Sequence, residues 1–259
     1  MAQSGSTRYS GTGDPARSLA LLWRTAERSA RKGRTDLSVD GIVRAAIEVA
    51  DSEGIGALSM RRVAEQLGVG TMSLYTHVPG KGELLDVMQD TVFGETARPD
   101  LTGQPWRARL EQVARENHAL YLRHPWLLQI ATNRPVLGPN MIAKYDYELR
   151  AVDGIGLTQV EMDSVITLVV GFVHGAARVS VDSAQAERDT GMTDERWWQA
   201  HQPFLARMSD PDTYPVAAAV GAAAGAEHNS AINPDHAFEF GLQRVLDGIE
   251  VLVQRRATE

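Results

Sequence analysis

Apolar residues recur at steps of three and four along much of this chain, which is the spacing of helices that bury one face. The pattern is clearest in residues 58–69, LSMRRVAEQLGV. Ser59 precedes the apolar positions as a candidate N-cap, because its hydroxyl can accept a hydrogen bond from a first-turn N–H. The pattern predicts a short helix with one buried face, formed by Met60, Val63, Ala64 and Leu67.

A tight turn and a still shorter helix follow. Gly68 and Gly70 supply the permissive backbone that a sharp turn needs. In the next helix Leu74 is expected to face inward, with Val78 behind it, before Pro79-Gly80 ends the helix. The outward positions form a dense run of hydrogen-bonding and apolar groups with almost no charge: Thr71, Met72, Ser73, Tyr75, Thr76 and His77.

Two helices this short need support, and the preceding stretch provides it. Ser38 is a candidate cap, and Gly54 is a candidate C-terminal stop. The apolar stripe between them is Ile42, Val43, Ala46, Ile47, Val49 and Ala50. We therefore predict a three-helix unit from about Leu37 to Val78. A helix, a glycine turn and a short polar helix form the helix-turn-helix pattern of DNA-binding proteins.

Residues 41–88 resemble the DNA-binding domain of TetR-family transcriptional regulators nearly end to end. The motifs that carry the resemblance are AAxExAxxxG at 45–54, LSMRRVAEQLGV at 58–69, LYxHV at 74–78 and KxxLL at 81–85. The remainder resembles the ligand-binding half of the tetracycline-repressor branch. The resemblance implies an all-α fold with three parts: an N-terminal extension (1–36), a helix-turn-helix domain (37–82) and a ligand-binding and dimerisation domain (83–259).

The resemblance also implies which residues meet DNA. Ser59 and Arg61 would lie at backbone phosphates, with Arg61 able to reach a guanine. Thr71, Met72 and Ser73 would face the bases, and Met72 suits a thymine methyl. Phosphate contacts fix the register without carrying sequence information, and they would come from Tyr75, Thr76, His77 and Lys81. The full expected set is Ser59, Met60, Arg61, Gly70, Thr71, Met72, Ser73, Tyr75, Thr76, His77 and Lys81.

Some of these positions admit a second interpretation. Tyr75 and His77 could be structural ties within the small domain. Arg62 is expected to point to solvent. Gly70 departs from family members that have a polar residue there, which leaves direct base contacts fewer. Upstream, residues 16–30 are compatible with a helix, and the basic stretch of Arg24, Arg28, Arg31, Lys32 and Arg34 is either a solvated arm or an extension that touches DNA.

The rest of the chain predicts further helices. The first, Lys81–Ala97, should link the two halves, and its movement is how the family passes a ligand signal to DNA. Residues 210–233 are rich in Ala and Gly with prolines, so we expect a mobile loop there. The other expected helices are Trp106–Arg123, Trp126–Thr132, Gly138–Val152, Leu157–Ala186 with a Thr158/Glu161 capping box, Asp194–Met208 and Ala237–Val253 after an Asn233 cap.

Two of these helices are broadly apolar. Leu157–Ala186 and Ala237–Val253 would pack with their copies as a four-helix bundle in a homodimer. The alternative is that both are internal core of a monomer. Because one short recognition helix reads few base pairs, a dimer would bind two half-sites about one helical turn, or a multiple of it, apart on a near-palindrome.

The inward faces of the central helices suggest a ligand pocket. The resemblance and these positions point to Asn117, Tyr121, Gln129, Asn133, Arg134, Tyr145, Ile166, Val170 and His174, although each could instead be core. Asn133-Arg134-Pro135 resembles the Thr-Arg-Pro turn of the tetracycline-repressor pocket. An apolar residue near Ile130 replaces the histidine that ligates drug-bound magnesium there, so tetracycline–magnesium is not the expected ligand.

Composition separates the two ends of the molecule. Residues 1–82 hold 11 Lys/Arg and 8 Asp/Glu, a charge of +3, whereas the remainder carries −10 of the chain's net −7. This asymmetry places an anionic partner at the N-terminal end. There is no cysteine, and we expect neither a secretory signal nor an apolar run near the ~20 residues that span a membrane, hence a cytoplasmic protein.

Enzyme motifs do not emerge from the sequence. There is no HExxH, GxSxG or P-loop, and the seven histidines are scattered. We therefore expect no catalytic residues, no metal and no cofactor. The sequence favours a homodimeric repressor that a small-molecule effector releases from operator DNA. The competing class is a ligand-binding scaffold kept for storage or protein contacts, which would leave the basic N-terminal end without a use.

Overall fold

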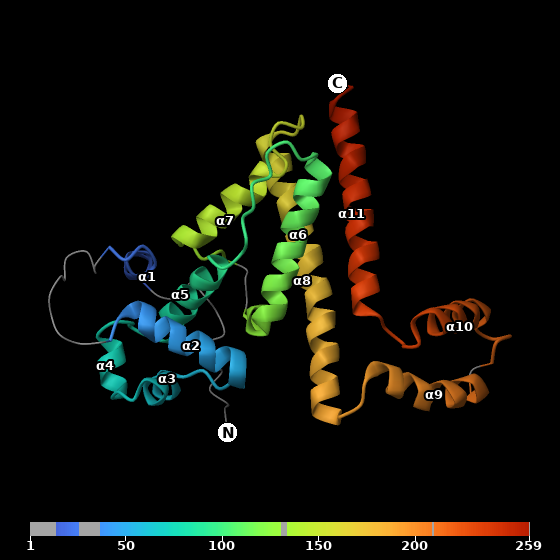
Figure 1. The fold of residues 1–259 in the computed structure, drawn as a ribbon, viewed down its shortest axis with the longest axis horizontal. Helices are drawn as coiled ribbons and strands as arrows, with labels where there is room; N and C mark the ends of the chain where they lie inside the picture. The colour runs from blue at the N-terminus through green and yellow to red at the C-terminus, as the bar shows by residue number, and fades with distance from the viewer. Residues whose placement is uncertain (1–13, 26–36, 131–133, 209, 259) are drawn as a thin grey trace.

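The computed structural model describes residues 14–25, 37–130, 134–208 and 210–258, and all regular structure in these ranges is helical (Figure 1). The predicted all-α class is confirmed. The elements are α1 (Pro15–Leu22), α2 (Val39–Glu53), α3 (Met60–Leu67), α4 (Thr71–Tyr75), α5 (Lys81–Phe93), α6 (Trp106–Arg123), the 3₁₀ helix η2 (Pro125–Gln129), α7 (Pro139–Arg150), α8 (Gln159–Thr190), α9 (Asp194–Met208), α10 (Pro215–His228) and α11 (Pro234–Arg256).

A small head is formed by α2, α3 and α4: α3 packs on both α2 and α4, and α2 also packs on α5. Its helices begin at the predicted caps: the Ser38 hydroxyl accepts from the Gly41 amide at 3.1 Å, and the Ser59 hydroxyl accepts from the Arg62 amide at 3.1 Å. Gly68 ends α3 in the left-handed region, with φ 67°, which a residue without a Cβ adopts at little cost. These caps fix the angle at which α4 leaves α3.

The body is built from long helices. α8 packs against α6 and α11, and α7 packs across α5 and α8. α8 begins at the predicted capping box, in which the Thr158 amide donates to the Glu161 carboxylate at 2.9 Å and the Glu161 amide donates to the Thr158 hydroxyl at 3.3 Å. It ends at Thr190, beyond the predicted Ala186. Figure 1 shows α8 and α11 running side by side.

Helix α5 joins head and body. It contacts α2 on one side and α7 on the other, and nearly every residue from Leu84 to Val92 is buried. The predicted linking helix is therefore present, although it ends at Phe93 and not at Ala97. Since a helix is a stiff element, a displacement at the α7 end of α5 reaches α2 directly.

The prediction of a mobile loop at residues 210–233 is wrong. Pro215–His228 forms α10, because alanine is the best helix former, Pro215 suits the first turn, and Asn229 closes the end with φ 48°. α10 packs closely on α9: a Cβ at Gly225 would lie 2.6 Å from Cζ2 of Trp198. The α9–α10 pair lies beside the lower ends of α8 and α11 (Figure 1).

Other expectations also need correction. α1 ends at Leu22, and residues 26–36, which include Arg28, Arg31, Lys32 and Arg34, lie outside the described residues. The segment after Pro125 is a 3₁₀ helix that ends at Gln129. By length and composition alone α8 is long and apolar enough to cross a membrane, which we did not expect from the sequence. The core helix of a globular protein passes the same test, and α8 packs on α6 and α11.

Candidate DNA-reading surface and ligand pocket

The inward and outward faces of α4 are sharply different. Leu74 and Val78 are fully buried, as predicted, and they hold the short helix on the head. On the opposite side the Met72 side chain is 77% exposed and Tyr75 is 45% exposed. Ser73 and Thr76 are also exposed, whereas Thr71 and His77 are half-buried. The head thus presents a compact face of uncharged donors, acceptors and apolar atoms.

Local hydrogen bonds shape this face. The Thr76 hydroxyl donates to the Ser73 carbonyl at 2.7 Å, which fixes its rotamer at the end of α4. Gly70 is the N-cap and has no side chain to cap the first turn of the helix. The first-turn amides of α4 therefore have no side-chain acceptor from their cap. The small side chains of this face allow a close approach to a duplex groove.

Two residues at the start of α3 were predicted to contact DNA, Arg61 and Met60, and their environments differ. Arg61 is 84% exposed in its side chain and pairs loosely with Glu65 at 2.8 Å, so it remains available to a phosphate or a base. Met60 is only 6% exposed and belongs to the core of the head, so its side chain is not at the surface that we predicted to contact DNA. The Ser59 hydroxyl is occupied as the cap of α3, although the residue itself is exposed.

Arg62 does not point freely to solvent. It forms a two-pronged ion pair with Glu53 of α2, with Nη2–Oε1 at 2.6 Å and Nε–Oε2 at 3.2 Å, and also donates to Gln66. Arg62 therefore ties α3 to α2. Lys81 donates from Nζ to the Leu58 carbonyl at 2.7 Å, which holds the start of α5 against the turn before α3. A phosphate contact by Lys81 would share its ammonium with this bond.

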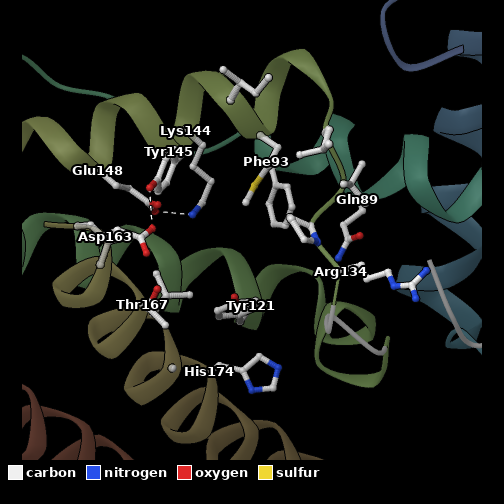
Figure 2. Close-up of a pocket in the computed structure, with 18 residues that line it drawn as sticks. Gln89, Phe93, Tyr121, Arg134, Lys144, Tyr145, Glu148, Asp163, Thr167 and His174 are labelled. Atoms are coloured by element: carbon white, nitrogen blue, oxygen red, sulfur yellow. Dashed lines mark hydrogen bonds and ion pairs between the residues drawn. The ribbon is translucent and has the colours of Figure 1, made fainter. Parts of the chain in front are cut away.

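A cavity of about 650 Å³ lies in the body between α5, α6, α7 and α8 (Figure 2). The predicted residues Tyr121, Arg134, Tyr145, Ile166, Val170 and His174 line it. Pro135, from the turn that resembles the tetracycline-repressor pocket, also lines it. Most of the wall is apolar, and the residues that the sequence did not point to are Gln89, Phe93, Val136, Leu137, Met141, Ile142, Lys144, Glu148, Asp163, Thr167 and Gly171. A cavity of this size and lining suits a drug-sized organic molecule.

Two predicted pocket residues, Asn117 and Gln129, are not on this wall. Asn117 is buried behind it, where its amide donates to the Val113 carbonyl at 2.9 Å and to Glu148 at 2.7 Å. Gln129 is exposed at the end of η2. Asn133 lies outside the described residues. Asn117 therefore holds the carboxylate of Glu148, which itself lines the cavity.

The polar side of the pocket is built on a buried ion pair. The Lys144 ammonium donates to the Glu148 carboxylate one turn further along α7, and both residues are about 95% buried. The same ammonium lies 5.6 Å from the centre of the Phe93 ring, within cation–π range. Because the two buried charges neutralise one another, the pair gives the pocket polar groups without adding a net charge.

The remaining polar groups lie at the rim and the floor. The Tyr145 hydroxyl on α7 donates to Asp163 on α8 at 2.6 Å, which bridges these two helices at the rim (Figure 2). On the floor, the Tyr121 and His174 rings meet edge to face at 5.4 Å. Burial raises the pKa of Tyr121 to about 12, and burial together with Arg178 lowers the pKa of His174. Both rings are therefore neutral near pH 7.

Asp90 connects the pocket to the head. It lies on α5 with 4% exposure and accepts hydrogen bonds from the Met141 amide at 2.9 Å and the Asn140 side chain at 3.1 Å. These donors lie in the first turn of α7, whose residue Met141 also lines the cavity. Gly138 is required beside it, since a Cβ there would overlap the Asp90 carboxylate. A ligand that shifts α7 therefore pulls on α5.

One signal could have found more of the pocket. Lys144 and Glu148 are four residues apart, which on a helix predicts a neighbouring pair, but such pairs are normally solvated. The Lys144–Glu148 pair is buried because neighbouring helices cover it, which the spacing in the sequence does not show. Among the described residues no group of three or more potential ligands could hold a metal ion.

A helix-turn-helix head that shares a helix with a hollow helical body defines a ligand-responsive transcriptional regulator. Residues 42–88 match the family model for bacterial regulatory proteins of the tetR family, and residues 98–253 match the tetracyclin repressor-like C-terminal domain. The chain belongs to the TetR family. It is a DNA-binding transcriptional regulator and not an enzyme.

Individual relatives agree with this assignment. The chain is 48% identical to the HTH-type transcriptional repressor DrrR1 of Streptomyces coeruleorubidus, over 99% of this chain and 93% of that protein. It is similar to the structure of ActR from Streptomyces coelicolor in complex with actinorhodin, with 28% identity, a TM-score of 0.69 and coverage of 83% and 96%. It is also similar to BioQ of Mycobacterium smegmatis with its double-stranded DNA operator, with 26% identity, a TM-score of 0.52 and coverage of 60% and 94%.

Proposed function

We propose that this protein is a cytoplasmic homodimeric repressor that binds a near-palindromic operator through α4 and is released when a small organic molecule fills the body cavity. The observation that carries the proposal is the continuous path from cavity to head: Met141 lines the cavity, its amide is held by Asp90, and Asp90 lies on α5, which packs on α2. The division at residue 82 assigns the start of α5 to the head and the rest of it to the body.

Apolar surface on α8 and α11 supports the dimer. Val160, Leu168, Phe240 and Val251 are 47–76% exposed on these helices. A shallow groove of about 400 Å³ runs between α8 and α11, with Val165, Ile249 and Leu252 in its wall. Exposed apolar residues of this number on two adjacent long helices favour burial against a copy of the same face. Two heads would then read two half-sites.

The pocket suggests the class of effector. Its wall is mainly aliphatic and aromatic, and its polar groups are neutral or internally paired, which suits a flat apolar molecule with a few hydroxyl or carbonyl groups. Actinorhodin, the ligand of ActR, is therefore a reasonable first probe. Ile130 is buried where the tetracycline repressor has its magnesium ligand, which does not favour a tetracycline–magnesium complex.

The test is fluorescence anisotropy with labelled promoter DNA that flanks the gene. We expect tight binding that weakens steeply with salt, and release on addition of actinorhodin. Tyr75→Ala should weaken binding about tenfold or more, because it removes a contact from the reading face. Tyr214→Ala is the matched control, since Tyr214 is 62% exposed far from the head. Equal affinity of the two variants, or a monomeric mass in solution, would contradict the proposal.

A further inference from the structure

The last turn of α1 lies where head, linking helix and pocket meet. α1 packs on α5, and Leu22 at its end is only 5% exposed. Its neighbours Trp23 and Arg24 do not continue the helix: Arg24 has φ 51°, in the left-handed region, so the chain turns sharply there. This segment belongs to the N-terminal extension, for which the sequence suggested either a solvated arm or a DNA contact.

Trp23 reaches the wall of the ligand cavity. Its indole Nε1 donates to the Leu137 carbonyl at 3.1 Å, across 114 positions of the sequence. Leu137 belongs to the pocket loop, residues 134–138, and itself lines the cavity. The loop leads directly into the first turn of α7, whose donors hold Asp90. Trp23 thus holds the outer side of a loop whose inner side faces the ligand.

Arg24 reaches in the opposite direction, to the head. Its guanidinium donates to Asp40 in the first turn of α2 at 2.7 Å from Nη2 and 3.2 Å from Nε. The same guanidinium donates to the Leu21 carbonyl, which fixes it to its own turn. Its positive charge also acts on Asp90 of α5. Two consecutive side chains therefore join the pocket loop to α2.

We infer that the α1 turn, Leu22–Arg24, is a positioning element of the ligand response: it couples the pocket loop to α2, in parallel with the Asp90 connection through α5. A ligand that displaces Leu137 moves Trp23, and because Arg24 is adjacent and rigidly held, α2 moves with it. The extension is then part of the signalling machinery of the body and head. This inference rests on the proposed function.

The coupling is reciprocal, so DNA can replace an unidentified effector in the test. Hydrogen exchange of residues 136–142 is measured by mass spectrometry with and without the flanking promoter DNA. In the wild type, DNA binding should change the exchange rate by about fivefold or more, the lower end of typical coupling factors. Trp23→Phe keeps the ring but removes the N–H donor, and Asp40→Asn removes the charge partner of Arg24. Each variant should still bind the DNA, but the change in exchange rate that DNA binding causes at residues 136–142 should be at least about twofold smaller than in the wild type.

Trp197→Phe is the matched control, because Trp197 on α9 has 44% exposure against 43% for Trp23. It should show the wild-type change. The inference is overturned if Trp23→Phe and Asp40→Asn retain the full DNA-induced change, or if they raise exchange equally with and without DNA, which indicates a local brace only. Failure of the wild type to bind the DNA would overturn the proposed function itself, and the coupling with it.

Discussion

The head and the body of this molecule place their candidate functional residues in opposite ways, outward in the head and inward in the body. The head buries a continuous set of apolar side chains and leaves the proposed DNA-contacting residues outside, on exposed positions of α4. The body turns its functional residues inward and must then bury charges, as it does with Lys144 and Glu148. Substitution of an exposed residue of α4 should therefore leave the fold of the head intact. Substitution of a buried polar residue of the pocket should affect both the stability of the body and ligand binding.

The largest expected effect tests the body. Glu148→Leu leaves the Lys144 ammonium buried without its partner, and we expect the free energy of unfolding to fall by about 3–5 kcal/mol. Lys144→Met combined with Glu148→Leu replaces both charges with apolar groups and should recover most of that loss. Urea denaturation of the two variants measures both values. If the single variant is as stable as the double variant, the pair is not a buried ionic unit.

A pair of variants on α4 tests the head. Leu74→Ala removes a fully buried side chain, and we expect a loss of about 2–4 kcal/mol in the stability of the head. Met72→Ala, two residues away and 77% exposed, should change stability by less than about 0.5 kcal/mol yet weaken DNA binding. Thermal unfolding and DNA anisotropy separate the two outcomes. A large stability loss in Met72→Ala would mean that the outward face is also structural.

The smallest effect concerns the surface of the body. The Arg256 guanidinium, at 2.6 Å from Glu161, and the Thr158 capping bonds lower the pKa of Glu161 to about 2. A depressed carboxyl pKa contributes stability above the unfolded-state value near 4.5, and this contribution is lost as the pH falls toward 2. Glu161→Gln should therefore flatten part of the decrease in melting temperature between pH 5 and about 2. Identical melting profiles would exclude this contribution.

The accuracy of the sequence predictions follows the same division. The head was predictable because its signals are local: a serine cap, glycines at a turn and apolar steps of three and four. Met60 and Arg62 were the exceptions, since packing against α2 decides their environment. In the body, most helices were predicted, although α10 was expected to be a loop, and six of the predicted residues line the cavity. Lys144, Glu148 and Asp163 line the cavity only through the packing of α5, α7 and α8.

The five-residue length of α4 has a further consequence. Two buried side chains, Leu74 and Val78, anchor it, and its cap is a glycine with no side chain. The outward positions therefore carry almost none of the architecture. If α4 reads the operator as proposed, substitutions at these positions can change the set of promoters that the protein binds without a compensating change elsewhere. The choice of target genes could then diversify while the scaffold stays the same.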